Sequence, residues 1–337
     1  MFGAYRTILA LFVVLDHFGG VPLIGAYAVF GFFALSGYLM TYIMQRNYGY
    51  TPRGIAGYGL NRFLRIYPIY WVACLVAIIV LASIGPEATT RINNHFAMPQ
   101  AADEWLRNLG LVLKISTSPV LIYPAWALTV ELFYYTCIGL GLSRFKTSTL
   151  LWFLASVAYT AFIVITDAPW GQRYYSVAAA SLPFATGAMI YHWRESLAQY
   201  CSFIVMNKWV PPFLLSLIVG NWALSTYMGA EDLWGLYINW LLCSAMIVAL
   251  FQRTKLPLVS RKLDSWLGDL SYPVYLVHFP LGFALLYVYR QLGLSVPGTG
   301  ATMFLYSVMP VLLAAWLMSV AVELPIERLR TRVKKSL

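Results

Sequence analysis

Ten long apolar runs constrain this chain more than any other feature of its sequence. A helix needs roughly 20 mainly apolar residues to cross the hydrocarbon core of a membrane, and each run has about that length. The runs lie near residues 6–25, 27–45, 66–84, 122–142, 150–166, 175–191, 211–227, 233–251, 271–290 and 301–322. We therefore predict an all-α, polytopic integral membrane protein of about ten transmembrane helices, built as one domain over residues 1–337.

The composition excludes the main soluble alternatives. Of the 337 residues, 60% are hydrophobic and 11% are charged, whereas soluble domains are about 45–50% apolar and about 25% charged. No stretch is polar enough to form a separate soluble module of useful size. A cytosolic enzyme, a disordered chain and a disulfide-stapled secreted scaffold are therefore excluded.

The basic residues indicate how the chain is oriented in the membrane. Ten crossings place both termini on one side. The opposite side would then hold Arg91, Arg107, Lys114, Arg173 and Arg290, which leaves 18 of the 23 Lys and Arg residues on the side of the termini. Because positively charged loops stay in the cytoplasm, we predict that both termini are cytoplasmic. The net charge of +10 then reflects orientation and attraction to anionic membrane lipids, and nucleic acid is not an expected partner.

The first apolar run carries three ionisable residues, Arg6, Asp16 and His17. An isolated charge in the hydrocarbon is costly, so each one is a hypothesis for a functional site. Eleven helical steps amount to about three turns plus 20°, which places Arg6 and His17 on one face, roughly 16 Å apart along the axis. Histidine is suited to accept a proton near neutral pH. The alternatives are a packed histidine bonded to a neighbouring helix, or a lone titrating residue of a pump.

A second group of polar residues, Trp126, Thr129 and Glu131, lies in the run at 122–142. Counted from residue 122, Glu131 is roughly 13 Å below the outer surface, and His17 is about 14 Å below it in a 30 Å core. Because these depths agree, Glu131 is predicted to orient the His17 imidazole or to stabilise its cation. The alternative is a buried carboxylate with a structural hydrogen-bonding role.

Arg62, Arg65 and Tyr67 lie at the inner start of the third run. Arginines three residues apart share a helix face, and their guanidinium groups fit phosphate oxygens. This pattern favours a cytosolic ligand that carries phosphate, although an anchor to anionic lipid headgroups gives the same pattern.

Ser271, Tyr272 and His278 open the ninth run, where both structural and substrate-lining roles remain open. No metal site is expected, because the four histidines lie on different segments without the spacing of metal ligands. These are His17, His95, His192 and His278.

The order of these segments resembles the integral-membrane acyltransferase family 3, whose members O-acylate cell-surface polysaccharides and related acceptors. Five segments match in order over residues 6 to 325, and Glu323-Leu-Pro325 resembles the closing segment. They are Arg6…His17, the stretch at 29–38 with Ser36, Arg62-x-x-Arg65-x-Tyr-Pro, Trp126-x-Leu-x-Val-Glu131, and the stretch at 267–278.

The resemblance implies a cytosolic acyl donor, commonly acyl-CoA and here expected to be acetyl-CoA, and an acceptor hydroxyl on the far side of the membrane. It implies no permanently bound cofactor and a multi-pass location in a bacterial inner membrane. It also implies that Arg6 and His17 are needed for activity, and that Arg62 and Arg65 form the cytoplasmic arginine motif of the family.

These observations predict a set of site residues. The catalytic group is expected to comprise His17 as general base, Glu131 or Asp16 as its orienting acid, and Arg6 for donor or oxyanion charge. Arg62, Arg65 and Tyr67 are expected to bind CoA. The residues predicted to line the substrate site are Ser36, Trp126, Thr129, Ser271, Tyr272 and His278.

One alternative differs in mechanism, and two differ in the class of protein. An acyl–enzyme could form on His17 or Ser36, but Ser36 precedes a glycine in a context that suits close helix packing, so direct transfer is preferred.

A transporter or flippase for a lipid-linked sugar would also have ten helices and buried charges. Against it, the sequence has no internal pseudo-repeat and no paired broken helices. A membrane glycosyltransferase or polymerase would need longer outer loops than this chain offers.

Overall fold

The computed structural model describes residues 1–86, 89, 93–254, 256–257 and 259–335. Arg91 and Lys255, two of the basic residues counted for the orientation, lie outside these residues. The α-helices are α1 (Gly3–Gly19), α2 (Ile24–Ile43), α3 (Pro52–Ile84), α5 (Ala102–Leu109), α6 (Trp126–Gly139), α7 (Lys146–Ile165), α8 (Val177–His192), α9 (Arg194–Tyr200), α10 (Ser202–Met206), α11 (Val210–Tyr227), α12 (Leu236–Leu250), α13 (Arg261–Gln291), α14 (Ala301–Met318) and α15 (Leu324–Lys335). No β-strand occurs in this part of the chain, so the predicted all-α class is confirmed.

Each predicted apolar run falls on one of these helices, but fewer than ten are long and apolar enough to cross a membrane by themselves. Among the described residues, six helical segments meet that requirement: Ile24–Tyr48, Pro52–Ile84, Lys146–Ile165, Glu231–Leu250, Arg261–Gln291 and Ala301–Thr331. Helices α1, α6 and α8 have only 17, 14 and 16 residues. The ten crossings and the side of the termini therefore stay predictions.

Two helices begin well before the apolar runs that predicted them. Helix α3 starts at Pro52, and the Thr51 hydroxyl accepts a hydrogen bond from the Gly54 N–H at 3.1 Å. Helix α13 starts at Arg261, and Ser260 accepts one from the Leu263 N–H at 3.2 Å. Both are N-caps, which satisfy the free donors of a first turn. An apolar run marks the part of a helix suited to lipid, whereas the cap fixes where the helix starts.

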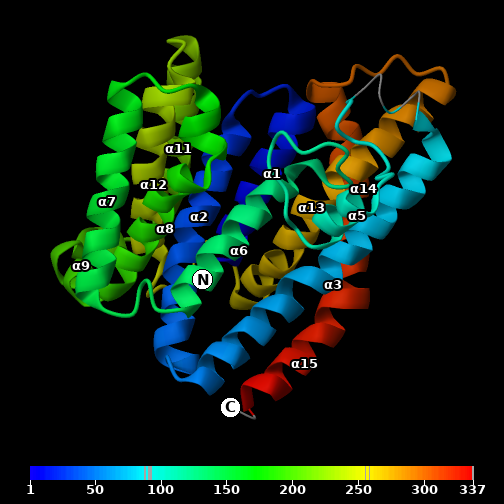
Figure 1. Ribbon diagram of the computed structural model, residues 1–337. Helices are drawn as coiled ribbons and strands as arrows, with labels where there is room; N and C mark the ends of the chain where they lie inside the picture. The colour runs from blue at the N-terminus through cyan, green and yellow to red at the C-terminus, as the bar shows by residue number, and fades with distance from the viewer. Residues whose placement is uncertain (87–88, 90–92, 255, 258, 336–337) are drawn as a thin grey trace.

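Helices α1 and α2 lie at the centre of the bundle (Figure 1). The most apolar window of α2 is 89% buried, against 17% for α7, so α2 is a central helix and α7 a peripheral one. Helix α2 packs against α1, α8 and α12, while α13 packs against α1, α3 and α14. Helix α6 crosses in front of α2 in Figure 1. Together α1, α2, α3, α6 and α13 surround the polar residues of the bundle.

Helices α2 and α8 cross at two glycines, Gly37 and Gly187. A methyl group on Gly187 would lie 2.0 Å from the Ala34 carbonyl oxygen, and one on Gly37 would lie 2.1 Å from the Phe184 carbonyl oxygen. Because both neighbours are backbone atoms, they cannot rotate away. Small residues of this kind let membrane helices approach closely.

Gly187→Ala is therefore expected to destabilise the protein by about 1–3 kcal/mol, the usual cost of overpacking. Thermal unfolding in detergent would measure it. Gly220→Ala on α11 is the matched control, because no described atom lies within 4 Å of the added methyl group. There the gain in helix propensity should leave stability equal or raised. Equal unfolding temperatures for the Gly187 variant and the wild type would contradict the argument.

Candidate active site

A cavity of about 140 Å³ lies where α1, α2, α3, α6 and α13 meet. We call it the inner cavity. Its walls are mostly apolar side chains of α2, such as Phe32 and Leu39. The charged side chains among its described lining residues are Arg6, Arg62, Arg65 and Glu131. Three guanidinium groups and one carboxylate give the cavity a positive lining, which suits an anionic ligand.

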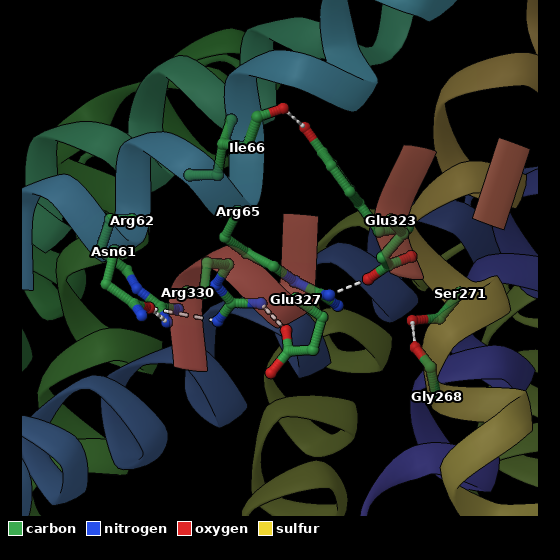
Figure 2. A network of polar contacts seen from close by, with 10 residues as sticks. Asn61, Arg62, Arg65, Ile66, Gly268, Ser271, Glu323, Glu327 and Arg330 are labelled. Carbon is green, nitrogen blue, oxygen red and sulfur yellow. Dashed lines mark hydrogen bonds and ion pairs between the residues drawn. The ribbon is translucent and has the colours of Figure 1, made fainter. Parts of the chain in front are cut away.

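Two of these arginines come from one face of α3, as their spacing predicts. The Arg62 guanidinium donates to the Asn61 side-chain oxygen at 2.6 Å. Arg65 forms an ion pair with Glu323, which lies in the π-helical turn that joins α14 to α15. Figure 2 shows both arginines extending from α3 toward the C-terminal segment. Their side chains are thus held at one end of the inner cavity.

The carboxylate of Glu131 is held inside the inner cavity by two hydroxyl groups. It accepts hydrogen bonds from Ser36 and, at 2.6 Å, from Tyr135. The predicted pairing of Glu131 with His17 is not what the structure shows, because His17 lines a different cavity. Two residues at the same depth in the membrane can still lie far apart within its plane. Their equal depth was therefore not enough to predict a pair.

A second cavity of about 60 Å³, the outer cavity, lies at the other end of α1. Asp16 and His17 line it together with Tyr123 and Trp126. In the described part of the chain, no hydrogen bond joins the Asp16 carboxylate to the His17 ring. Arg6 lines the inner cavity and His17 the outer one, so the eleven-residue spacing does direct both into the bundle.

The partner of His17 is His278 of α13. The His17 Nδ1 and His278 Nε2 atoms lie 2.8 Å apart, and the His278 Nδ1 lies 3.1 Å from the Val274 carbonyl oxygen. A carbonyl only accepts, so His278 carries its proton on Nδ1 and presents an unprotonated Nε2. The His17 Nδ1–H must therefore donate to it. These two bonds fix the tautomer of both neutral rings.

This tautomer leaves the His17 Nε2 atom with a free lone pair. Among the described residues Nε2 has no hydrogen-bond partner, and the His17 side chain lines the outer cavity. An oriented neutral imidazole whose second nitrogen faces a cavity is the arrangement that a general base requires. The sequence-based expectation left His278 between a structural and a substrate-lining role; the structure places it behind His17 instead.

The two cavities meet at shared wall residues. Val29 of α2 and Tyr275 of α13 line both. The Tyr275 hydroxyl donates to the Pro124 carbonyl oxygen at 2.7 Å, which anchors its ring beside the short 3₁₀ turn at Tyr123–Ala125. A ligand in the inner cavity and a ligand in the outer cavity would therefore approach each other at this wall.

Besides His278, two predicted site residues lie outside both cavities. The Thr129 hydroxyl donates to the Leu111 carbonyl oxygen at 2.7 Å, and the Tyr67 hydroxyl donates to the Gly110 carbonyl oxygen at 3.0 Å. Both hold the segment that follows α5. Thr129 lies two residues from Glu131, and Tyr67 two from Arg65. Two residues correspond to about 200° of helix, which is the opposite face.

The remaining predicted residues line one of the cavities: Ser36, Ser271 and Tyr272 the inner one and Trp126 the outer one. Two further lining residues, Tyr135 and Tyr275, were not predicted from the sequence. Each lies four residues after a predicted site residue, Glu131 and Ser271, so the same-face rule could have found both. Among the described residues, no group of three or more His, Cys, Asp or Glu side chains could hold a metal ion.

Comparison with known proteins identifies one family. The model of a family described as an acyltransferase domain matches residues 4–322. A search of curated proteins and a search of solved structures each found no match. The matched range includes the inner-cavity arginines of α1 and α3, the two paired histidines and the Val29–Tyr275 wall. The chain therefore belongs to acyltransferase family 3, as a membrane acyltransferase.

Proposed function

We propose that this protein transfers an acyl group, expected to be acetyl, from cytosolic acyl-CoA to a hydroxyl group of an extracytoplasmic polysaccharide or oligosaccharide. The single observation that carries the proposal is the pair of adjoining cavities. One cavity has an arginine-rich lining, the other contains an oriented histidine, and Val29 and Tyr275 separate them. Such a pair suits a reaction whose two substrates come from opposite sides of a bacterial inner membrane.

The inner cavity suits the donor. The Arg62 and Arg65 guanidinium groups bind the phosphates of CoA, because planar forks match phosphate oxygens. The pantetheine arm lies along the apolar side chains of α2, and its thioester reaches Val29. Arg6 is roughly 16 Å from His17 along α1, so its role is to stabilise the charged donor rather than the reacting carbonyl.

The outer cavity suits the acceptor. The His17 Nε2 atom takes the proton of the acceptor hydroxyl as its oxygen attacks the thioester carbonyl carbon. The new C–O ester bond forms, the C–S bond breaks, and the proton on His17 passes to the departing CoA sulfur. The His278 Nε2 atom keeps the His17 Nδ1–H hydrogen-bonded throughout. Transfer is direct in this scheme, and no acyl group rests on Ser36.

The runner-up is a transporter or flippase of a lipid-linked sugar. Membership of an acyltransferase family disfavours it, and one experiment separates the two. Surface glycans from cells with and without the gene are compared by mass spectrometry, with a strain that expresses His17→Ala as a third sample. Glycans that lose one acyl group per repeat, in both the deletion and the His17→Ala strain, support transfer. Loss of whole repeat units in the deletion strain would contradict it.

A further inference from the structure

Helix α15 lies alongside α3, beside the end of the inner cavity that Arg62 and Arg65 line (Figure 1). Three charged residues are spaced four and three positions apart here, which places them on one helix face. They are Glu323, in the turn just before α15, and Glu327 and Arg330 within α15. That face points at α3, as the ion pair of Glu323 with Arg65 shows. The family match ends at residue 322, so these three residues lie beyond it.

Arg330 reaches the arginine motif of α3. One of its terminal nitrogens forms an ion pair with Glu327, and the other donates to the Asn61 side-chain oxygen at 3.1 Å. The Arg62 guanidinium donates to that same oxygen at 2.6 Å. Figure 2 shows the ends of the Asn61, Arg62 and Arg330 side chains close together, with dashed lines joining Asn61 to both arginines. Two like charges therefore lie side by side and share one neutral acceptor.

These two arginines are short of acceptors. Their Nε atoms are buried and have no hydrogen-bond partner among the described residues. The Arg330 side chain is 13% exposed, whereas its partner Glu327 is 52% exposed. A half-exposed carboxylate can rotate away into solvent at little cost. A phosphate group that enters between the arginines would supply acceptor oxygens and separate the two like charges.

We infer that Arg330 is a further phosphate-binding residue of the donor site, with Arg62 as its neighbour, and that Glu327 holds its guanidinium until phosphate replaces the carboxylate. The inference rests on the proposed function, because it assumes that the phosphates belong to acyl-CoA. Phospholipid headgroups carry the same chemistry, so the test must separate the two sources.

The test measures the Kd of free CoA for the purified full-length protein by calorimetry, in nanodiscs of phosphatidylcholine only. One lost charge-assisted contact should weaken binding roughly tenfold in Arg330→Ala. Arg328→Ala is the matched control, because Arg328 is exposed on the same helix, and its Kd should not change. Glu327→Gln frees Arg330 from its ion pair and should lower the Kd, an effect in the opposite direction to damage of the fold.

Three outcomes would count against the inference. In the first, the Arg330→Ala and Arg328→Ala variants have equal Kd values for CoA while Arg62→Ala binds CoA more weakly. This would overturn the inference and leave the proposed function standing. So would an Arg330→Ala variant that keeps its CoA affinity but loses the thermal stabilisation that phosphatidylglycerol nanodiscs give the wild type, since Arg330 would then bind lipid. Absence of CoA binding by the wild type would overturn the proposed function and the inference together.

Discussion

His17→Ala is expected to lower kcat for acyl transfer by roughly 10²- to 10⁴-fold, the usual contribution of a general base. The loss follows because, in the proposed mechanism, the Nε2 atom of His17, which lines the outer cavity, accepts the proton. The Kd of CoA should stay unchanged, since the same proposal has the donor phosphates bind at the far end of the inner cavity. Steady-state transfer from radiolabelled acetyl-CoA in proteoliposomes would give kcat, and calorimetry would give the Kd. Full activity of the variant would refute the role of His17.

His278 offers a graded control for that experiment. In the proposed mechanism it acts through His17 as a positioning residue, so His278→Ala should lower kcat less than His17→Ala does. His278→Gln should recover part of the loss, because the glutamine side-chain oxygen can accept the His17 Nδ1–H. Equal damage from alanine and glutamine would point to a purely structural role. A labelled acyl group trapped on the protein without acceptor would replace direct transfer by an acyl–enzyme.

Arg65→Ala is expected to destabilise the protein by roughly 3–5 kcal/mol, the cost of leaving one partner of a buried ion pair alone. The stranded partner is Glu323, whose side chain is 7% exposed. The variant should also bind CoA more weakly, because it loses one of the guanidinium groups that the proposal assigns to the CoA phosphates. Thermal unfolding in detergent and a CoA titration would measure the two effects separately.

A double variant separates stability from donor binding. Arg65→Met combined with Glu323→Leu removes both charges at similar volume, which often restores or raises stability. We expect it to unfold near the wild-type temperature and still to bind CoA weakly. Recovery of CoA affinity together with stability would show that Arg65 serves the fold alone.

The sequence predicts helix positions better than helix starts. Every apolar run coincides with a helix because lipid-exposed and buried helices are both rich in apolar residues. The first 14 residues of α3 were missed because this segment is polar, and only the Thr51 cap marks where it begins. Helices α1, α6 and α8 are also shorter than the apolar runs that predicted them, because an apolar run can continue into the turns beside a helix.

For the site residues, too, relations within one helix follow from the sequence, whereas contacts between helices do not. The spacing of Arg6 and His17 predicts a shared face because helical geometry fixes the relative direction of residues on one helix, and each of the two lines a cavity inside the bundle. The pairing of His17 with His278 was not predicted, since it joins residues 261 positions apart in the sequence. Which helices become neighbours depends on packing such as the close crossing at Gly37 and Gly187, and a single sequence does not reveal that packing.

The wall formed by Val29 and Tyr275 has a consequence for the energetics of the cell envelope. Nucleotides are supplied in the cytoplasm and not outside it. The free energy for making an extracytoplasmic ester must therefore come from the donor's thioester bond, which is made in the cytoplasm. If donor and acceptor bind on either side of these two side chains, as proposed, only a small acyl unit has to change compartments. The bulky carrier would then stay on the side where it was made.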